Sequence, residues 1–267
     1  MRRFLGVTGS DLRLRRTSLL LMWSAAVAIL VAGIAAIYPT VRANPSLDNI
    51  YGDLSPTLQA LLGGSSLTSP AGYLNTQLFA FFLPAVLLVF AIGRGAGSIA
   101  GEEEERTLDL LLAQPVDRRR LYVEKALAVL VGVVALTIAC IVAVVAVRAP
   151  ADLTLPYGHL VAVCVQMGLL CAALGLGAQA IAAATGRRAV GIAAAAGYTF
   201  VSYVVYGLST TVHPLYYVRP LTLWRWYLGG DPLTTGFGGE AVGVLVATSV
   251  VIVAAGMLAF RRRDLHA

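Results

Sequence analysis

The segment GEEEERTLDLLLAQPVDRRRL, residues 101–121, is the most charged part of this chain and lies between two long apolar stretches. Of the 267 residues, 58% are hydrophobic and only 13% are charged, whereas a soluble domain carries about 25% charged residues. The mean hydropathy of +0.78 points the same way. The composition therefore indicates a chain that lies mostly in lipid and places this one charged segment in water.

Six apolar segments are candidates for membrane-spanning helices, because crossing the hydrocarbon core takes roughly 20 apolar residues in a helix. The second of them carries Pro84, which predicts a kink. The first follows a basic start, as a signal peptide would, but its apolar core is longer than usual and five spans follow, so we expect it to stay uncleaved. The spans are expected at residues 18–38, 77–93, 126–147, 160–185, 189–208 and 241–260. The sequence thus predicts an all-α polytopic membrane protein, with residues 1–267 forming a single transmembrane domain.

The basic residues predict which side of the membrane each connection faces. Sixteen of the twenty lie in the two terminal tails, in the loop between spans two and three, or between spans four and five, and four lie on the other side. By the positive-inside rule, both termini and the charged loop are expected in the cytoplasm. The four on the outer side are Arg42, Arg148, Arg219 and Arg225.

Two long segments are expected on the outer side, at residues 39–76 and 209–240. The first is rich in Pro, Gly, Ser and Asn and is typical of a loop with one short helix. The second is aromatic and too interrupted to span, which fits an interfacial or re-entrant helix before span six, or a plain aromatic belt. The aromatic residues concerned are Tyr216, Tyr217, Trp224, Trp226 and Tyr227.

The charged segment itself predicts a short amphipathic helix over residues 101–114. Its glutamates fall in the first turn, where the helix dipole favours negative charge, and Pro115 ends it. Leu108, Leu111 and Leu112 follow at a spacing that gives one apolar face. A helix lying on an anionic cytoplasmic leaflet is expected to be basic, so the acidic end suits a protein partner better, although a simple connector lying on lipid is the alternative.

The same segment resembles the cytoplasmic loop of bacterial ABC transporter permeases of the type-2 exporter class. Gly101, Glu102, Glu103, the run 107–116 and Arg118 match that family's pattern, and Arg106 stands where the family has glycine. Three shorter stretches resemble later parts of the family in the expected order, namely ATGRRA at 184–189, GGDPL at 229–233 and FRRRDL at 260–265.

The resemblance implies a coupling helix that docks on a separate ATP-binding cassette subunit, which would hold the ATP and Mg. It also implies a second permease copy or a sister permease. The chain itself contains no phosphate-binding P-loop, since its only lysine, Lys125, follows Glu124. The residues assigned to coupling by this resemblance are Gly101, Glu102, Glu103, Glu104, Glu105, Arg106, Thr107, Leu108, Asp109, Leu111, Leu112, Gln114 and Pro115.

The interior of the expected spans contains no charged residue, whereas ion-coupled transporters usually carry an acid, a histidine or a broken-helix site there. Energy supplied from outside the chain is therefore the better interpretation. A few uncharged polar residues remain as candidates for a translocation path, or for hydrogen bonds between helices. They are Gln166, Gln179, Tyr198, Ser202, Tyr203 and Tyr206.

An enzyme is disfavoured, because the chain has no HExxH or GxSxG motif and its three histidines stand far apart. Cys140, Cys164 and Cys171 fall inside apolar runs and are expected to act as small buried side chains, with no metal site.

The sequence thus predicts the permease subunit of a bacterial ABC transporter in the cytoplasmic membrane, and the resemblance implies an exporter. An ion-coupled secondary transporter or channel and a non-transporting scaffold or assembly factor are the alternatives.

Overall fold

The computed structural model describes residues 4–44, 46–55, 58–59, 62, 66–104, 118–209 and 211–262. Within these ranges every regular element is a helix, and six helical stretches are long and apolar enough to cross a membrane. They are the apolar part of α1 (Phe4–Arg42), the stretch Pro70–Gly97, α8 (Arg118–Arg148), α9 (Tyr157–Thr185), α10 (Arg188–Leu208) and α14 (Gly239–Arg262). The predicted all-α class with six spans is confirmed.

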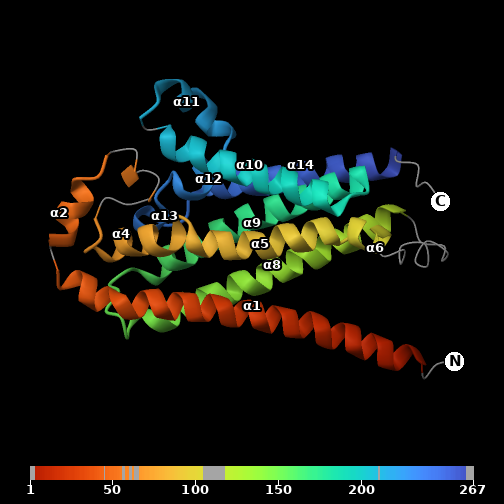
Figure 1. Ribbon diagram of the computed structural model, residues 1–267, viewed down its shortest axis with the longest axis horizontal. Coiled ribbons are helices and arrows are strands. Elements are labelled where there is room, and N and C mark those ends of the chain that lie inside the picture. Colours follow the sequence, from red (N-terminus) through yellow and green to blue (C-terminus); the bar gives the residue numbers. More distant parts are fainter. Residues whose placement is uncertain are drawn as a thin grey trace.

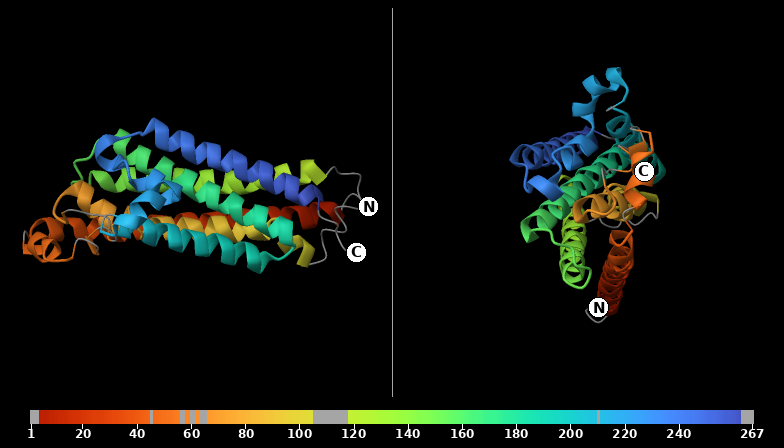
Figure 2. Two further views of the ribbon diagram at one scale, coloured as in Figure 1. Left: turned by 90° about the horizontal axis from the view of Figure 1, so that it is seen from above. Right: turned by 90° about the vertical axis from the view of Figure 1, so that its left-hand side faces the viewer.

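The helix α9 lies at the centre of the bundle, and it packs against α8, α10, α14 and α5 (Phe82–Gly97) (Figure 1). The helix α1 packs mainly on α8 and lies at the edge, as the end-on view in Figure 2 shows. The N-terminal end of α1, the C-terminal end of α14 and α6 (Ala100–Glu104) lie at the same end of the bundle. This arrangement places the described ends of the chain and the start of the charged segment on one membrane face.

Small residues let the neighbouring helices approach α9 closely. A Cβ atom at Gly95 of α5 would lie 1.9 Å from the carbonyl oxygen of Gly175 on α9. At Gly256 of α14 it would lie 2.6 Å from the Cβ of Ala180 on the same central helix. Lipid tails are as apolar as the side chains, so helices in a membrane associate through such close van der Waals packing rather than through hydrophobic burial.

The stretch Pro70–Gly97 is not one regular helix. It consists of α4 (Pro70–Leu74), a π-helical turn η1 (Asn75–Phe79) and α5, with a break at Ala80 and Phe81. Pro84 lies one turn after the break and cannot donate a hydrogen bond to the carbonyl of Ala80. The hydroxyl of Tyr227 donates to the carbonyl oxygen of Phe79 at 3.0 Å and so satisfies a group exposed by the break.

The outer segments are more helical than the sequence indicated. The first span continues to Arg42, and helix resumes at Pro70, so the loop expected over residues 39–76 is shorter at both ends. Between them lies α2 (Ser46–Gly52), whose Asp48 accepts hydrogen bonds from the backbone and side chains of residues 66–68. The hydroxyl of Thr68, followed by the amides of Leu67 and Thr68, lowers the pKa of Asp48, and this carboxylate anchors the loop.

The aromatic segment before the last span divides into an exposed part and a buried part. In α11 (His213–Val218), Tyr216 and Tyr217 are exposed, as expected for an interfacial belt. In α12 (Leu223–Leu228), by contrast, Trp224 and Tyr227 are buried against the outer ends of the bundle. A short α13 (Pro232–Thr235) then leads to α14.

We expect Gly95→Ala to destabilise the bundle by about 1–3 kcal/mol, because the added methyl must push α5 away from the backbone of α9. Gly93→Ala on the same helix is the control, since its Cβ would meet nothing within 4 Å. Unfolding in mixed micelles measures both. Equal stability of the two variants would show that the close approach of α5 to α9 does not hold the bundle together.

Candidate functional site

The predicted coupling helix is described by the structure only at its start. Gly101, Glu102, Glu103 and Glu104 lie in α6, which follows α5 after a short turn at Ser98. The remaining predicted coupling residues lie outside the described residues: Glu105, Arg106, Thr107, Leu108, Asp109, Leu111, Leu112, Gln114 and Pro115.

Two glutamates tie α6 to neighbouring helices. Glu102 forms an ion pair with Lys125 on α8, and the two side chains are 26% and 18% exposed. Glu104 accepts a hydrogen bond from the backbone amide of Arg188, the first residue of α10, at 3.0 Å. A carboxylate is favourable there because the first amides of a helix lack partners within the helix. The start of the charged segment is thereby held to α8 and α10 at once.

The ion pair between Lys125 and Glu102 is less exposed than a second ion pair, which lies within α8. Arg120 and Glu124 are paired at 2.8 Å with a spacing of four residues, and their side chains are 77% and 56% exposed. Exposed pairs of this kind contribute little because water screens both charges. The Lys125–Glu102 pair is more shielded, and it joins two elements rather than two turns of one helix.

The two glutamines proposed for a translocation path lie at different depths of α9. In the orientation that satisfies both amide groups, Gln166 donates to the carbonyl oxygen of Tyr227 at 2.9 Å and accepts from the amide of Gly238 at 3.3 Å. Gln179 donates to the carbonyl oxygen of Tyr122 on α8 at 3.3 Å. Thirteen residues of helix separate them by about 20 Å. Both side chains bond to other elements of the bundle, which is the alternative role that the sequence left open.

The four candidates on α10 contact different neighbouring elements. The hydroxyl of Tyr198 donates to the carbonyl oxygen of Leu221 at 2.9 Å, and Ser202 is buried. The guanidinium of Arg219 lies 5.2 Å from the ring centre of Tyr206. The ring of Tyr203 lies 5.0 Å from that of Trp224 and 5.8 Å from that of Phe81. The structure therefore does not bring the six candidates together into one polar path.

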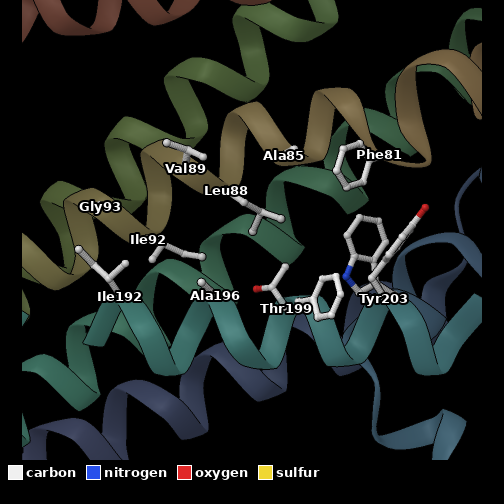
Figure 3. A pocket seen from close by; sticks show the side chains of 12 residues that line it. Phe81, Ala85, Leu88, Val89, Ile92, Gly93, Ile192, Ala196, Thr199 and Tyr203 are labelled. Carbon is white, nitrogen blue, oxygen red and sulfur yellow. The ribbon is translucent and has the colours of Figure 1, made fainter. Parts of the chain in front are cut away.

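Tyr203 belongs to a different feature, an apolar groove of about 400 Å³ between α5 and α10 (Figure 3). Residues of α5 and residues of α10 form its two walls, and Phe81 and Tyr203 lie at the end opposite α6 (Figure 3), where the ring of Trp224 contacts that of Tyr203. The α5 wall includes Leu88 and Ile92, and the α10 wall includes Ile192 and Ala196. Sequence reasoning missed this groove because its lining residues are as apolar as those that face lipid.

Among the described residues, no three His, Cys, Asp or Glu side chains gather as a metal site would require. The three cysteines are free and buried. The sulfur atoms of Cys140 and Cys164 lie 3.6 Å apart, in contact but beyond the length of a disulfide bond.

The chain matches a known family of membrane proteins over nearly its whole length. The model of the ABC-2 family transporter protein matches residues 7–265, which is nearly the whole chain. A comparison with curated proteins found no match. The chain therefore belongs to the ABC-2 transporter family, and it is a multi-pass membrane permease component of an ABC transporter. Membership of this family implies partnership with an ATP-binding cassette subunit.

A double-mutant cycle on Lys125 and Glu102, using alanine at each position, is expected to give a coupling free energy of about 1 kcal/mol or more, because the pair is partly shielded from water. The same cycle on Arg120 and Glu124 is the matched control and is expected to give about 0.3–0.5 kcal/mol. Unfolding in mixed micelles measures both cycles. A coupling energy for Lys125 and Glu102 no larger than the control would contradict the anchoring of α6.

Proposed function

We propose that this chain is the permease of an ATP-driven exporter in a bacterial cytoplasmic membrane, with both termini in the cytoplasm. The observation that carries the proposal is the match of an ABC-2 transporter family over nearly the whole chain. The positive-inside rule supports the orientation, since the membrane face that carries α6 also carries most of the basic residues. The resemblance of the charged segment to type-2 exporters supports the direction of transport.

The proposed energy source is ATP hydrolysis in a separate subunit that docks on residues 101–115. A docking helix transmits movement only if its base is fixed to the bundle. The bonds of Glu102 and Glu104 to α8 and α10 supply that fixation. Glu103 and Glu105 are the acidic residues of the run for which we propose contact with the ATPase, through a basic groove on its surface.

The proposed translocation path runs along the groove between α5 and α10, with Tyr203 as its polar group at the outer end. An apolar, laterally accessible lining suits a hydrophobic or amphipathic substrate. A second copy of the permease, or a sister permease, would close the groove from the other side. Gln166 and Gln179 are proposed to hold the bundle together rather than to contact substrate.

Co-expression with its genomic neighbours tests the proposal. With the affinity tag on the permease alone, we expect a P-loop ATPase to co-purify. Replacing Glu103 and Glu105 together by alanine is expected to weaken this association by roughly tenfold, because two charge contacts with the partner are lost.

Glu124→Ala is the control, since it removes an acidic side chain from the same membrane face but outside the charged run. Both variants leave the bonds of Glu102 and Glu104 in place. A wild-type permease that purifies without any ATPase and catalyses flux driven by an ion gradient would overturn the proposed function. Equal ATPase recovery with the double variant and with the wild type would overturn only the proposed docking residues.

A further inference from the structure

A second cavity, of about 670 Å³, lies at the end of the bundle that carries α6, between α1, α5, α8 and α10. Toward this end α1 diverges from α8, as Figure 1 shows. The cavity is separate from the apolar groove, although Val89 and Gly93 of α5 line both. Its volume lies within the range of small-molecule sites, roughly 300–1,000 Å³.

The lining changes from apolar to charged with depth on α5 and on α8. On α1 and α5, Trp23 and Phe90 form the apolar part, with their ring centres 5.9 Å apart. One turn nearer the end of α5 comes Arg94, and on α8 the lining passes from Val129 to Lys125. The apolar part therefore lies at the depth of lipid tails, and the charged part lies at the depth of the headgroups.

The charged part carries three basic and two acidic side chains. One of the acids, Glu124, is bound by Arg120, which does not line the cavity, and the other, Glu102, is paired with Lys125. The stem of Arg188 crosses the bare backbone of α5 and α6, because its Nε and Cδ lie 3.5 and 4.0 Å from the positions that Cβ atoms at Gly97 and Gly101 would occupy. The side chain of Arg188 thus reaches the cavity from α10 by lying along α5 and α6.

We propose that this cavity binds an anionic phospholipid, with its phosphate beside Arg188 and an acyl chain against Trp23 and Phe90. Basic pockets between transmembrane helices on the cytoplasmic side are suited to anionic headgroups, because the surrounding low dielectric strengthens the attraction. A water-soluble anion would not use the apolar half, and in a zwitterionic lipid such as phosphatidylcholine the choline cation offsets the attraction between the phosphate and Arg188. The proposed lipid site is independent of the proposed docking of an ATPase.

Quenching of tryptophan fluorescence by brominated lipids tests the site directly. The permease is reconstituted in phosphatidylcholine vesicles that contain either brominated phosphatidylglycerol or brominated phosphatidylcholine. The signal of Trp23 is obtained by subtracting that of Trp23→Phe, since Trp224 and Trp226 lie at the opposite end. We expect Trp23 to favour the anionic lipid roughly fivefold, as one basic contact provides.

Arg188→Gln is expected to reduce that preference to near unity, and Arg188→Lys is expected to retain most of it. Arg187→Gln is the matched control, because this neighbouring arginine is exposed as Arg188 is but does not line the cavity. Unchanged quenching of the two remaining tryptophans by either lipid establishes that each variant is folded. Equal quenching of Trp23 by both lipids, or an equal loss of preference in Arg187→Gln and Arg188→Gln, would overturn the proposal.

Discussion

The close approach of neighbouring helices to α9 is the constraint on which the rest of the structure depends. In lipid, apolar surface gives no preference for one helix over another, so a bundle is held by dense packing and by hydrogen bonds between helices. The central helix provides both. Its glycines and alanines allow the backbones of α5 and α14 to approach it closely. Its two glutamines form hydrogen bonds to α8 and to the segment before α14. The positions of α5 and α10, and hence the groove between them, follow from their shared partner.

At the charged face of the bundle, two bonds between elements hold α6 in place. Two carboxylates of α6 join α8 and α10, which both pack on α9. A displacement of α6 therefore acts on α8 and α10 through these two bonds, and on α5 through the short turn at Ser98. Of these three helices, α5 and α10 form the groove. This arrangement would suit the proposed permease driven by an external ATPase, because force would enter at one membrane face and the proposed path lies deeper in the bundle.

The sequence was sufficient for the features that hydropathy and charge determine. The number of spans followed from the lengths of the apolar segments, and Pro84 marked the irregular helix correctly. The burial of Trp224 and Tyr227 was not predictable in the same way, because aromatic residues in a membrane interface and in a packed outer end have the same composition. The glutamines likewise carried two interpretations, and their hydrogen bonds to Tyr122, Tyr227 and Gly238 support the structural one. In the apolar spans, the faces that meet lipid and the faces that meet other helices are equally hydrophobic. Neither the groove nor the partner of each helix could therefore be predicted from the sequence.

The central claim is that ATP hydrolysis in a partner subunit reaches the groove through α6. It is tested most directly by the distance between spin labels at Val89→Cys and Phe200→Cys, which lie on the two walls, in the complex with the ATPase. The account predicts that trapping ATP changes this distance in the intact protein and leaves it unchanged when the pair of Lys125 and Glu102 is removed. A distance that stays the same in the intact complex while the ATPase turns over would contradict it.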